Sequence, residues 1–416
     1  MIVLMAPQAL PRVKETLRMG PRPFGHHLMI GLCASLSLPF TLPSLRNASP
    51  SSSLAPNVLP EKLLELLKEN NPAFDAALGA ASVERARAFL AGVKAYRHYP
   101  GRRDVHEAPV IWHEGTTKLR DYNPSQPAAP IILVIPSLIN RFDILDLDLA
   151  PSFLRTLAAS GLRPLVVDWD EPGKGEARFT LDDYTARLTS ILAWVTKTVP
   201  AQQVHLLGYC MGGLLALALA TLRPASIKTL TLMATPWDFH QPNPAAGHLL
   251  AELADEWDEA MEATGHMPVD IIQYLFALLQ PFQSVTKFVD FAATDQSSME
   301  ARQFVLVEDW LNDGVPLPLA VARTCLKEWY GQNATASLTW SVAGHMIAPR
   351  ALTMPSYVVV PGRDRIVPPE SALPLAKLLP HATLHEPMTG HIGMMASRNA
   401  SHQVWKPLLH WLAEHV

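Results

Sequence analysis

The sequence predicts an α/β protein: a doubly wound, mostly parallel sheet with an inserted helical cap and an N-terminal helical extension. Short apolar runs with strand character alternate with helical patterns, which favours right-handed βαβ crossovers. The strand pattern stops after Thr235 and resumes only at Ser356. A helical stretch between two strands is typical of a cap over the edge of such a sheet.

Length and composition allow a large core. The chain has 416 residues, of which 49% are hydrophobic and only 17% are charged, below the usual quarter. The net charge of −4, without a basic block, argues against nucleic acid as the main partner. Cys33, Cys210 and Cys325 lie too far apart for a disulfide framework or a zinc cluster. We therefore expect a reducing, cytoplasmic setting and no metal or redox cofactor.

Residues 1–60 are interpreted as an N-terminal segment and linker, and 61–108 as a helical extension. The apolar stretch from His26 to Leu42 superficially resembles a signal peptide, but histidines open it and prolines break it. No run reaches the ~18–20 apolar residues of a membrane helix. We interpret this stretch as a helix that binds a hydrophobic surface, followed by a Ser/Pro/Asn-rich linker over 47–60.

The sheet is expected within 109–240 and 351–416, the two parts of the core. Two short runs read as a hairpin, and Ile131–Ile135 reads as a central strand buried on both faces. The hairpin strands are Pro109–Trp112 and Thr117–Tyr122, and the later strands are Pro164–Val167, Val204–Leu207, Thr229–Met233, Ser356–Val360 and Thr383–Glu386.

Helical spacing marks the remaining elements. Thr180 is expected to cap a helix that begins at Leu181. Further helices are expected at 61–68, 83–96, 370–378 and 403–414, with another ending at Ala159. The cap insertion covers 241–350, with helices at 245–263, 271–279, 299–311 and 320–329.

The turn around Cys210 has the features of a nucleophile site. Gly208-Tyr-Cys210-Met-Gly212-Gly213 joins a predicted strand to a predicted helix. Its small residues let strand and helix approach closely, so that the apex residue adopts strained backbone geometry and projects its side chain. The helix N-terminus would lower the thiol pKa. A buried cysteine in a Gly-rich turn gives the same local pattern, so the interpretation depends on the rest of the chain.

Asp364 and His391 complete a candidate triad, because each falls just past a strand end. The order nucleophile, acid, histidine is that of the α/β hydrolases. His391 would take the proton of Cys210, and Asp364 would fix the imidazole tautomer. Asp238, which follows the preceding strand, is the alternative acid.

The same chemistry requires donors for a developing oxyanion. We expect one donor from the N–H of Met211 and a second from the loop after the strand at Ile131, with Leu138, Ile139 and Asn140 as candidates. Cysteine in place of serine favours acyl transfer from a thioester, because exchange between a thiol and a thioester is nearly isoenergetic.

Five ordered motifs together resemble the polyhydroxyalkanoate synthases, which are cysteine-dependent polymerases of the α/β-hydrolase fold. The likeness runs from about Val110 to the C-terminus. The motifs are Gly208–Gly213, Pro136-Ser-Leu-Ile-Asn-Arg-Phe-Asp-Ile-Leu-Asp146, Asp168-Trp169 followed by Thr180-Leu-Asp-Asp-Tyr184, Asp364-Arg-Ile-Val-Pro368, and Gly390-His-Ile-Gly393.

The resemblance implies a role for each triad residue. Cys210 would carry the growing 3-hydroxyacyl chain, His391 would activate it, and Asp364 would help to activate the incoming hydroxyl. The implied substrate is a 3-hydroxyacyl-CoA, with CoA release, a polyester product and no cofactor. The resemblance leaves open a homodimer, a second synthase subunit, and association with polyester granules in the cytoplasm.

Three positions depart from the pattern of that family: Leu214 replaces a usual threonine, Arg365 a histidine and Pro369 a common tryptophan. The alternative function is therefore a cysteine hydrolase of the same fold, either a thioesterase or a hydroxyalkanoate depolymerase or esterase. Whether the cap encloses a dry channel over Cys210 separates the two. A non-catalytic protein that coats a polymer or lipid surface is a third reading, against which the intact triad argues.

Overall fold

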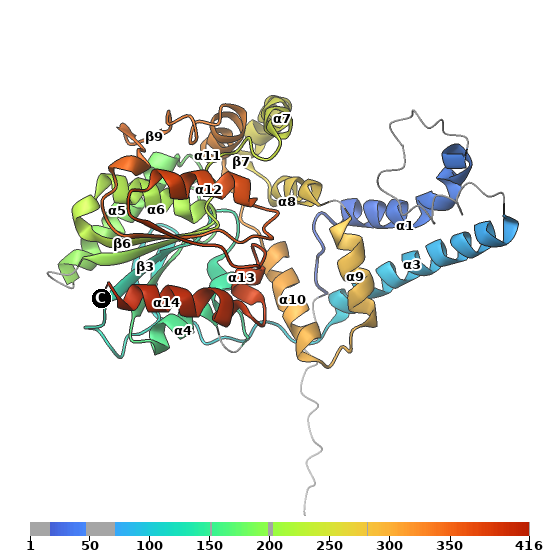
Figure 1. Ribbon diagram of the computed structural model, residues 1–416, viewed down its shortest axis with the longest axis horizontal. Helices are drawn as coiled ribbons and strands as arrows, with labels where there is room; N and C mark the ends of the chain where they lie inside the picture. Colours follow the sequence, from blue (N-terminus) through green and yellow to red (C-terminus); the bar gives the residue numbers. More distant parts are fainter. Residues whose placement is uncertain (1–16, 47–70, 150–151, 199–202, 281, 416) are drawn as a thin grey trace, which may run out of the picture. The chain divides into compact units, whose positions relative to one another are not determined.

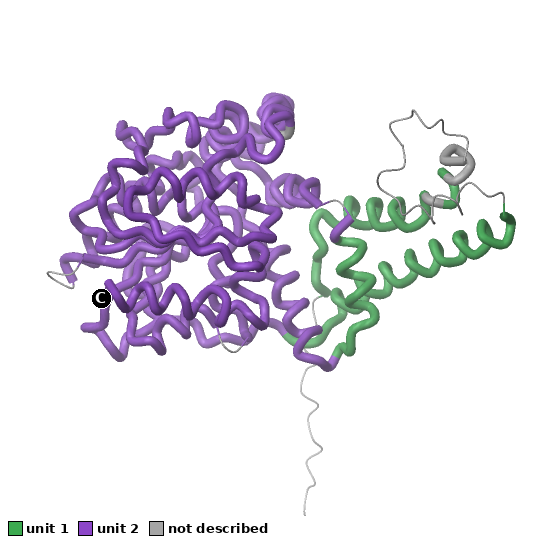
Figure 2. The backbone as a smooth tube through the Cα atoms, in the orientation of Figure 1, with its two compact units in different colours: residues 1–101, 284–296 green, residues 102–283, 297–416 purple. Residues whose placement is uncertain are grey.

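The computed structural model describes residues 17–46, 71–149, 152–198, 203–280 and 282–415. The chain divides into two compact units (Figure 2). One unit comprises the residues up to Gly101 together with Ser284–Gln296, and the larger unit comprises Arg102–Gln283 and Ser297–Val416.

The larger unit is built on a sheet whose strand order among the described residues is β1-β2-β4-β3-β5-β6-β11-β12. β1 pairs antiparallel with β2, and β2 pairs antiparallel with β4. From β4 to β12 the strands run parallel, which confirms the predicted fold class. The strands are β1 Val110–Glu114, β2 Thr117–Asp121, β3 Ile131–Ile135, β4 Arg163–Asp168, β5 Val204–Tyr209, β6 Ile227–Met233, β11 Ser356–Val359 and β12 Ala382–His385.

Helices cover both faces of this sheet (Figure 1). α5 (Leu181–Thr198), α6 (Met211–Leu222) and α12 (Pro369–Leu378) pack into one hydrophobic cluster. α4 (Phe153–Ala159) and α14 (Lys406–Ala413) pack into another on the opposite face. Every residue of β3 and β5 is buried, because central parallel strands are covered on both sides.

The predicted start of α5 is confirmed. The Asp183 N–H donates to Oγ1 of Thr180 at 3.3 Å, and the Thr180 N–H donates to the Asp183 carboxylate at 2.8 Å. This reciprocal pair satisfies donors that the first helical turn would otherwise leave unpaired.

The insertion (residues 241–350) contains the helices that the sequence predicts, but it differs from the prediction in three respects. The last predicted helix is split into α11 and a π-helical segment, Thr324–Gly331. Two-residue strands also pair, β7 (His266–Met267) with β8 (Leu317–Pro318) and β9 (Ser341–Val342) with β10 (His345–Met346). So short a pairing leaves no periodicity in the sequence. The helices are α7 Pro244–Thr264, α8 Val269–Leu279, α9 Gln283–Ala293, α10 Met299–Asn312 and α11 Leu319–Arg323.

Helix α9 was not predicted, and Ser284–Gln296 belongs to the smaller unit, apart from the rest of the insertion. That unit also contains α1 (Phe24–Arg46) and α3 (Pro72–His98). The Phe288 ring packs on Phe89 and Tyr96 of α3, with centroids 6.3 and 5.9 Å apart. A pairing between segments so distant in sequence has no local signature.

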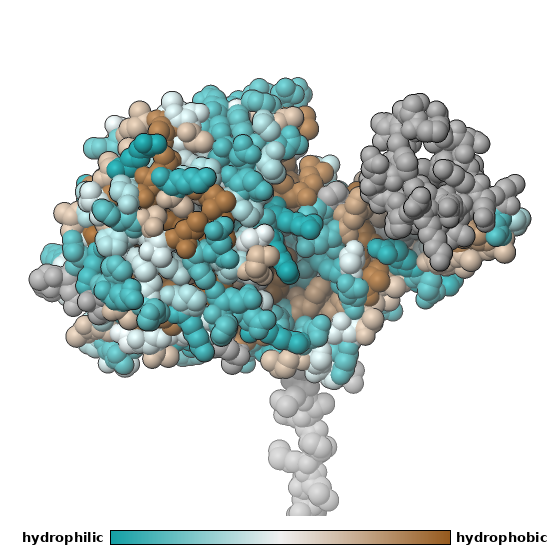
Figure 3. Space-filling model, in the orientation of Figure 1, coloured by the Kyte–Doolittle hydropathy of each residue, from teal (hydrophilic) through white to brown (hydrophobic). Residues whose placement is uncertain are grey.

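The apolar N-terminal stretch forms helix α1, as expected, and the helix continues through Pro39 instead of ending there. No helix among the described residues is long and apolar enough to cross a membrane. The predicted linker over 47–60 and the predicted helix at 61–68 lie outside the described residues. On the visible face of the larger unit, hydrophilic and hydrophobic residues are interspersed (Figure 3).

Candidate active site

Cys210 lies at the predicted apex between β5 and α6. Its backbone has φ 57° and ψ −128°, a conformation that few non-glycine residues adopt. Two hydrogen bonds hold the turn: the Cys210 N–H donates to the Met233 carbonyl and the Gly213 N–H to the Cys210 carbonyl, both at 2.9 Å. The strained apex thus presents the thiol at the carboxyl edge of the sheet.

The glycines of this turn are required by close backbone contacts. A Cβ at Gly208 would collide with the backbone of Gly213. A Cβ at Gly212 would collide with the carbonyl oxygens of Ile135 and Pro136. Since Pro136 follows β3, the second contact places the start of the loop after β3 directly against the cysteine turn.

His391 and Asp364 meet at the same edge, after β12 and β11. Nδ1 of His391 lies 2.7 Å from Oδ2 of Asp364, and both side chains are buried. Oδ1 of Asp364 accepts the N–H groups of Ile366 and Val367 at 2.9 and 2.8 Å. Both carboxylate oxygens are therefore occupied, and the ring of His391 is oriented by Nδ1 with Nε2 left for the thiol.

The charge on His391 is set by its neighbours. Burial would lower the pKa of His391, but the charges of Asp364 and Cys210 and hydrogen bonds to both raise this pKa to about 10. The arrangement thus places a protonated imidazole beside the sulfur of Cys210, and a positive charge at this place activates a cysteine nucleophile.

Tyr209 supports the histidine and is a residue that the sequence analysis did not single out. Its hydroxyl donates to the His391 carbonyl at 3.2 Å, and the two rings lie 5.2 Å apart. Burial raises the pKa of Tyr209 well above its ordinary value, so this donor keeps its proton. The position of Tyr209, immediately before the nucleophile, is the one feature of the sequence that points to this contact.

The alternative acid, Asp238, is engaged elsewhere. Its Oδ1 accepts the His240 N–H at 3.1 Å and the Asn333 side-chain amide at 2.8 Å. The structure therefore brings Asp364, and not Asp238, to His391. The described residues contain no group of three or more His, Cys, Asp or Glu side chains that could hold a metal ion.

The three candidate residues of the loop after β3 differ in how their polar groups are used. The Ile139 N–H donates to Oγ of Ser137 at 3.2 Å. The Asn140 side-chain amide donates to the Trp310 carbonyl at 3.4 Å. Among the described residues, no acceptor is found for the Leu138 N–H. This group, together with the Met211 N–H in the first turn of α6, is therefore available for an oxyanion.

The insertion contributes Tyr330, from the π-helical segment, to the surroundings of Cys210. Burial first, and then the thiols of Cys325 and Cys210, raise the pKa of Tyr330 above its ordinary value. Its ring packs on Phe239 with centroids 5.0 Å apart. Cys325 is a buried thiol whose pKa burial raises to about 12, so it stays protonated at neutral pH.

Comparisons with known proteins agree with this fold. A family model described as "alpha/beta hydrolase fold" matches residues 130–396. "Poly(3-hydroxyalkanoate) polymerase subunit PhaC" of Haloferax mediterranei is 30% identical over 73% of this chain and 63% of its own length. Proteins of the same name from Synechocystis sp. and Haloarcula marismortui are 28% and 27% identical, over 73% and 75% of this chain and 84% and 69% of their own lengths.

These similarities confirm the resemblance to the polyhydroxyalkanoate synthases that the motifs indicate. The chain spans less than two thirds of the length of the Haloferax relative.

Proposed function

We propose that this chain, which belongs to the alpha/beta hydrolase fold family, is an acyltransferase of polyhydroxyalkanoate synthase type. It polymerises 3-hydroxyacyl-CoA through an acyl chain covalently bound to Cys210 and releases CoA. The observation that carries this proposal is a cysteine, and not a serine, at a strained apex beside a buried His391–Asp364 pair. Similarity to proteins named as polymerases supports the same assignment.

In the first step, the Cys210 sulfur attacks the thioester carbonyl carbon. The proton of the thiol is held by His391, and the carbonyl oxygen gains negative charge that the Met211 and Leu138 N–H groups stabilise. The bond between this carbon and the CoA sulfur then breaks, and the leaving thiolate takes the proton from His391. A thioester replaces a thioester, so the acyl group keeps its activation.

In the second step, the hydroxyl of another 3-hydroxyacyl unit attacks the carbonyl carbon of the acyl-cysteine. His391 accepts the hydroxyl proton, and Asp364 stabilises the imidazolium that results. The carbon–sulfur bond of Cys210 breaks, an ester forms, and the Cys210 thiolate is recovered beside the protonated histidine. The thiolate then attacks the CoA thioester of the added unit as in the first step, so that CoA leaves and the longer chain returns to Cys210. No metal or redox group is needed for either step.

The relatives reported above are named as polymerase subunits. We accordingly propose that this chain works as part of an assembly, either with a second copy or with a second subunit. We also propose that it associates with the surface of its polyester product inside the cell, through the apolar helix α1.

The experiment follows free thiol and light scattering together during incubation of the full chain with 3-hydroxybutyryl-CoA. We expect thiol release with rising turbidity, and neither signal with Cys210→Ala. Thiol release accompanied only by free 3-hydroxybutyrate would instead identify a thioesterase. No release across a range of protein concentrations would exclude the polymerase and direct attention to hydrolysis of polymer or ester.

A further inference from the structure

The loop after β3, residues 136–141, is attached to the insertion by hydrogen bonds to its main-chain carbonyls. The Val315 N–H donates to the Ile139 carbonyl at 2.8 Å. The indole Nε1 of Trp310 donates to the Arg141 carbonyl at 2.7 Å. Residues separated by about 170 positions in the chain thus share one short ladder, and the end of α10 fixes one side of the loop.

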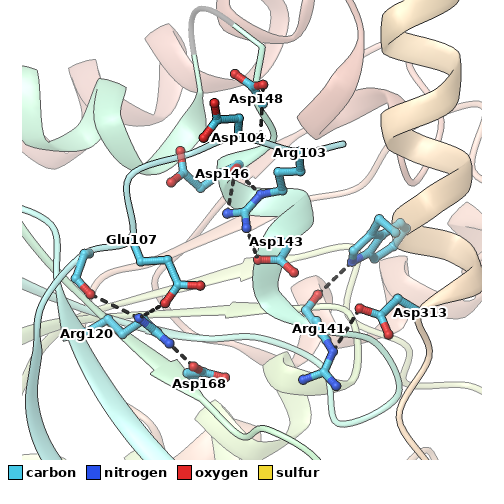
Figure 4. A network of polar contacts seen from close by, with 12 residues as sticks. Arg103, Asp104, Glu107, Arg120, Arg141, Asp143, Asp146, Asp148, Asp168 and Asp313 are labelled. Atoms are coloured by element: carbon cyan, nitrogen blue, oxygen red, sulfur yellow. Dashed lines mark hydrogen bonds and ion pairs between the residues drawn. The ribbon is translucent and has the colours of Figure 1, made fainter. Parts of the chain in front are cut away.

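The side chain of Arg141 extends this attachment to two carboxylates. Its Nε lies 3.0 Å from the Asp313 carboxylate, at the end of α10 (Figure 4). A terminal nitrogen lies 3.0 Å from the Asp170 carboxylate, just after β4. The other oxygen of Asp170 accepts the Lys118 ammonium at 2.8 Å. Arg141 therefore connects the loop, the sheet edge and the insertion.

The other end of the same loop is also fixed. The Trp169 indole donates to the Pro136 carbonyl at 3.1 Å, and Gly212 lies against that carbonyl. Leu138 lies between these fixed ends, and its N–H is a loop donor available to an oxyanion. The direction of this N–H thus depends on Pro136 on one side and on Arg141 on the other.

The two ends of the loop differ in how far their contacts are exposed to solvent. Pro136 is held by buried groups of the sheet and α6. At the other end, the side chains of Arg141 and Asp313 are 29% and 60% exposed, and Asp313 belongs to the insertion. A planar guanidinium that meets two carboxylates fixes orientation better than a single charge can, because its donors are rigidly spaced.

We propose that Arg141 is a positioning residue that aims the Leu138 N–H at the oxyanion through its contacts with Asp313 and Asp170. Acylation of Cys210 then requires residues 310–315 of the insertion to be docked on the loop. The inference rests on the proposed function only in that Cys210 is acylated, and it applies to any acyl donor.

The test separates stabilisation of the oxyanion from reactivity of the thiol. Acylation by p-nitrophenyl butyrate passes through an oxyanion, whereas alkylation by iodoacetamide is a displacement that forms none. Asp313→Asn and Arg141→Lys weaken the attachment and keep side-chain size. Asp258→Asn is the matched control, because Asp258 pairs with Arg323 at 2.7 Å in the same insertion, away from the loop.

We expect Asp313→Asn and Arg141→Lys to slow acylation by about 10- to 100-fold, below the 10²–10³-fold loss of a deleted oxyanion donor. Alkylation of Cys210 should stay within about twofold of wild type, since His391 and Asp364 are untouched. The control should match wild type in both assays. Trp310→Phe removes the hydrogen bond to the Arg141 carbonyl and serves as the substitute if either charge variant fails to fold. It should slow acylation as much as Asp313→Asn is expected to.

Unchanged acylation in the folded variants would overturn the inference, and so would an equal loss of alkylation. Failure of the wild type to act on 3-hydroxybutyryl-CoA, with a normal ester burst, would refute the proposed function and leave this inference standing. Absence of any acylation of wild-type Cys210 would overturn both.

Discussion

At the scale of single residues, the site depends on how each polar group around the thiol is used. One carboxylate oxygen of Asp364 accepts two backbone N–H groups, and the other accepts Nδ1 of His391. A carboxylate held in this way cannot rotate away from the histidine, and this fixes which ring nitrogen faces Cys210. The position of each residue after a strand end was readable from the sequence, whereas these hydrogen bonds were not.

The raised pKa of His391 predicts the pH dependence of thiol reactivity. A histidine with a pKa of about 10 keeps its proton from neutral pH to about pH 9, so Cys210 faces a positive charge over that range. The rate of alkylation by iodoacetamide should therefore be nearly constant between about pH 6.5 and 9. In His391→Gln the rate should rise with pH as for an ordinary thiol, and a similar rise in wild type would contradict the ion pair.

Tyr209 should matter through the loop that carries His391. Tyr209→Phe removes one buried hydrogen bond to the His391 carbonyl, so we expect about 1 kcal/mol lower stability and roughly fivefold lower kcat. Tyr357→Phe is the control, since this ring is buried on β11 of the same sheet and packs on Trp411 and His385 instead of His391. Chemical unfolding and steady-state assays measure both effects, and equal behaviour of the two variants would refute the role.

At the scale of elements, the cysteine turn and the loop after β3 form one packed unit. Gly212→Ala introduces a Cβ against the Ile135 and Pro136 carbonyls, which belong to backbone and cannot yield easily. We expect at least about 2 kcal/mol lower stability and a large loss of acylation. Gly175→Ala, where a Cβ meets nothing within 4 Å, is the control and should be close to wild type in thermal unfolding. Native stability of Gly212→Ala would contradict this packing.

The elements that the sequence predicted are those with strong local patterns. β3 and β5 are continuous apolar runs, and Thr180 marks the start of α5 with a reciprocal cap. Helix α9 and the split of the last insertion helix were missed. Their form depends on contacts with distant segments, such as the packing of Phe288 on α3, and periodicity carries no trace of such contacts.

The residues proposed for the candidate site are likewise those with strong local patterns in the sequence. Cys210, Asp364 and His391 follow from a turn motif and two strand ends. Among Leu138, Ile139 and Asn140, the structure was needed to set Ile139 aside, because its N–H already donates to Oγ of Ser137. The contact of Arg141 with Asp313 joins segments that only the folded chain brings together.

At the scale of the whole molecule, we expect helix α1 to attach the protein to polyester. Met29 and Phe40 on this helix are 58% and 83% exposed, which is costly in water and favourable on an apolar surface. Met29→Ser with Phe40→Ser should reduce sedimentation with poly-3-hydroxybutyrate particles by roughly tenfold. Leu384→Ser, an exposed apolar position of the larger unit, is the control and should bind as wild type does. Undiminished binding of the double variant would exclude α1 as the attachment site.

The proposed mechanism requires Cys210 to carry a growing chain. Intact-protein mass spectrometry of the full chain, quenched at successive times after mixing with 3-hydroxybutyryl-CoA, tests this claim most directly. We expect a ladder of adducts, each longer by one 3-hydroxybutyryl unit, mapped by proteolysis to Cys210 and absent from Cys210→Ala. A single unit that decays to free acid, or adducts on another residue, would contradict it.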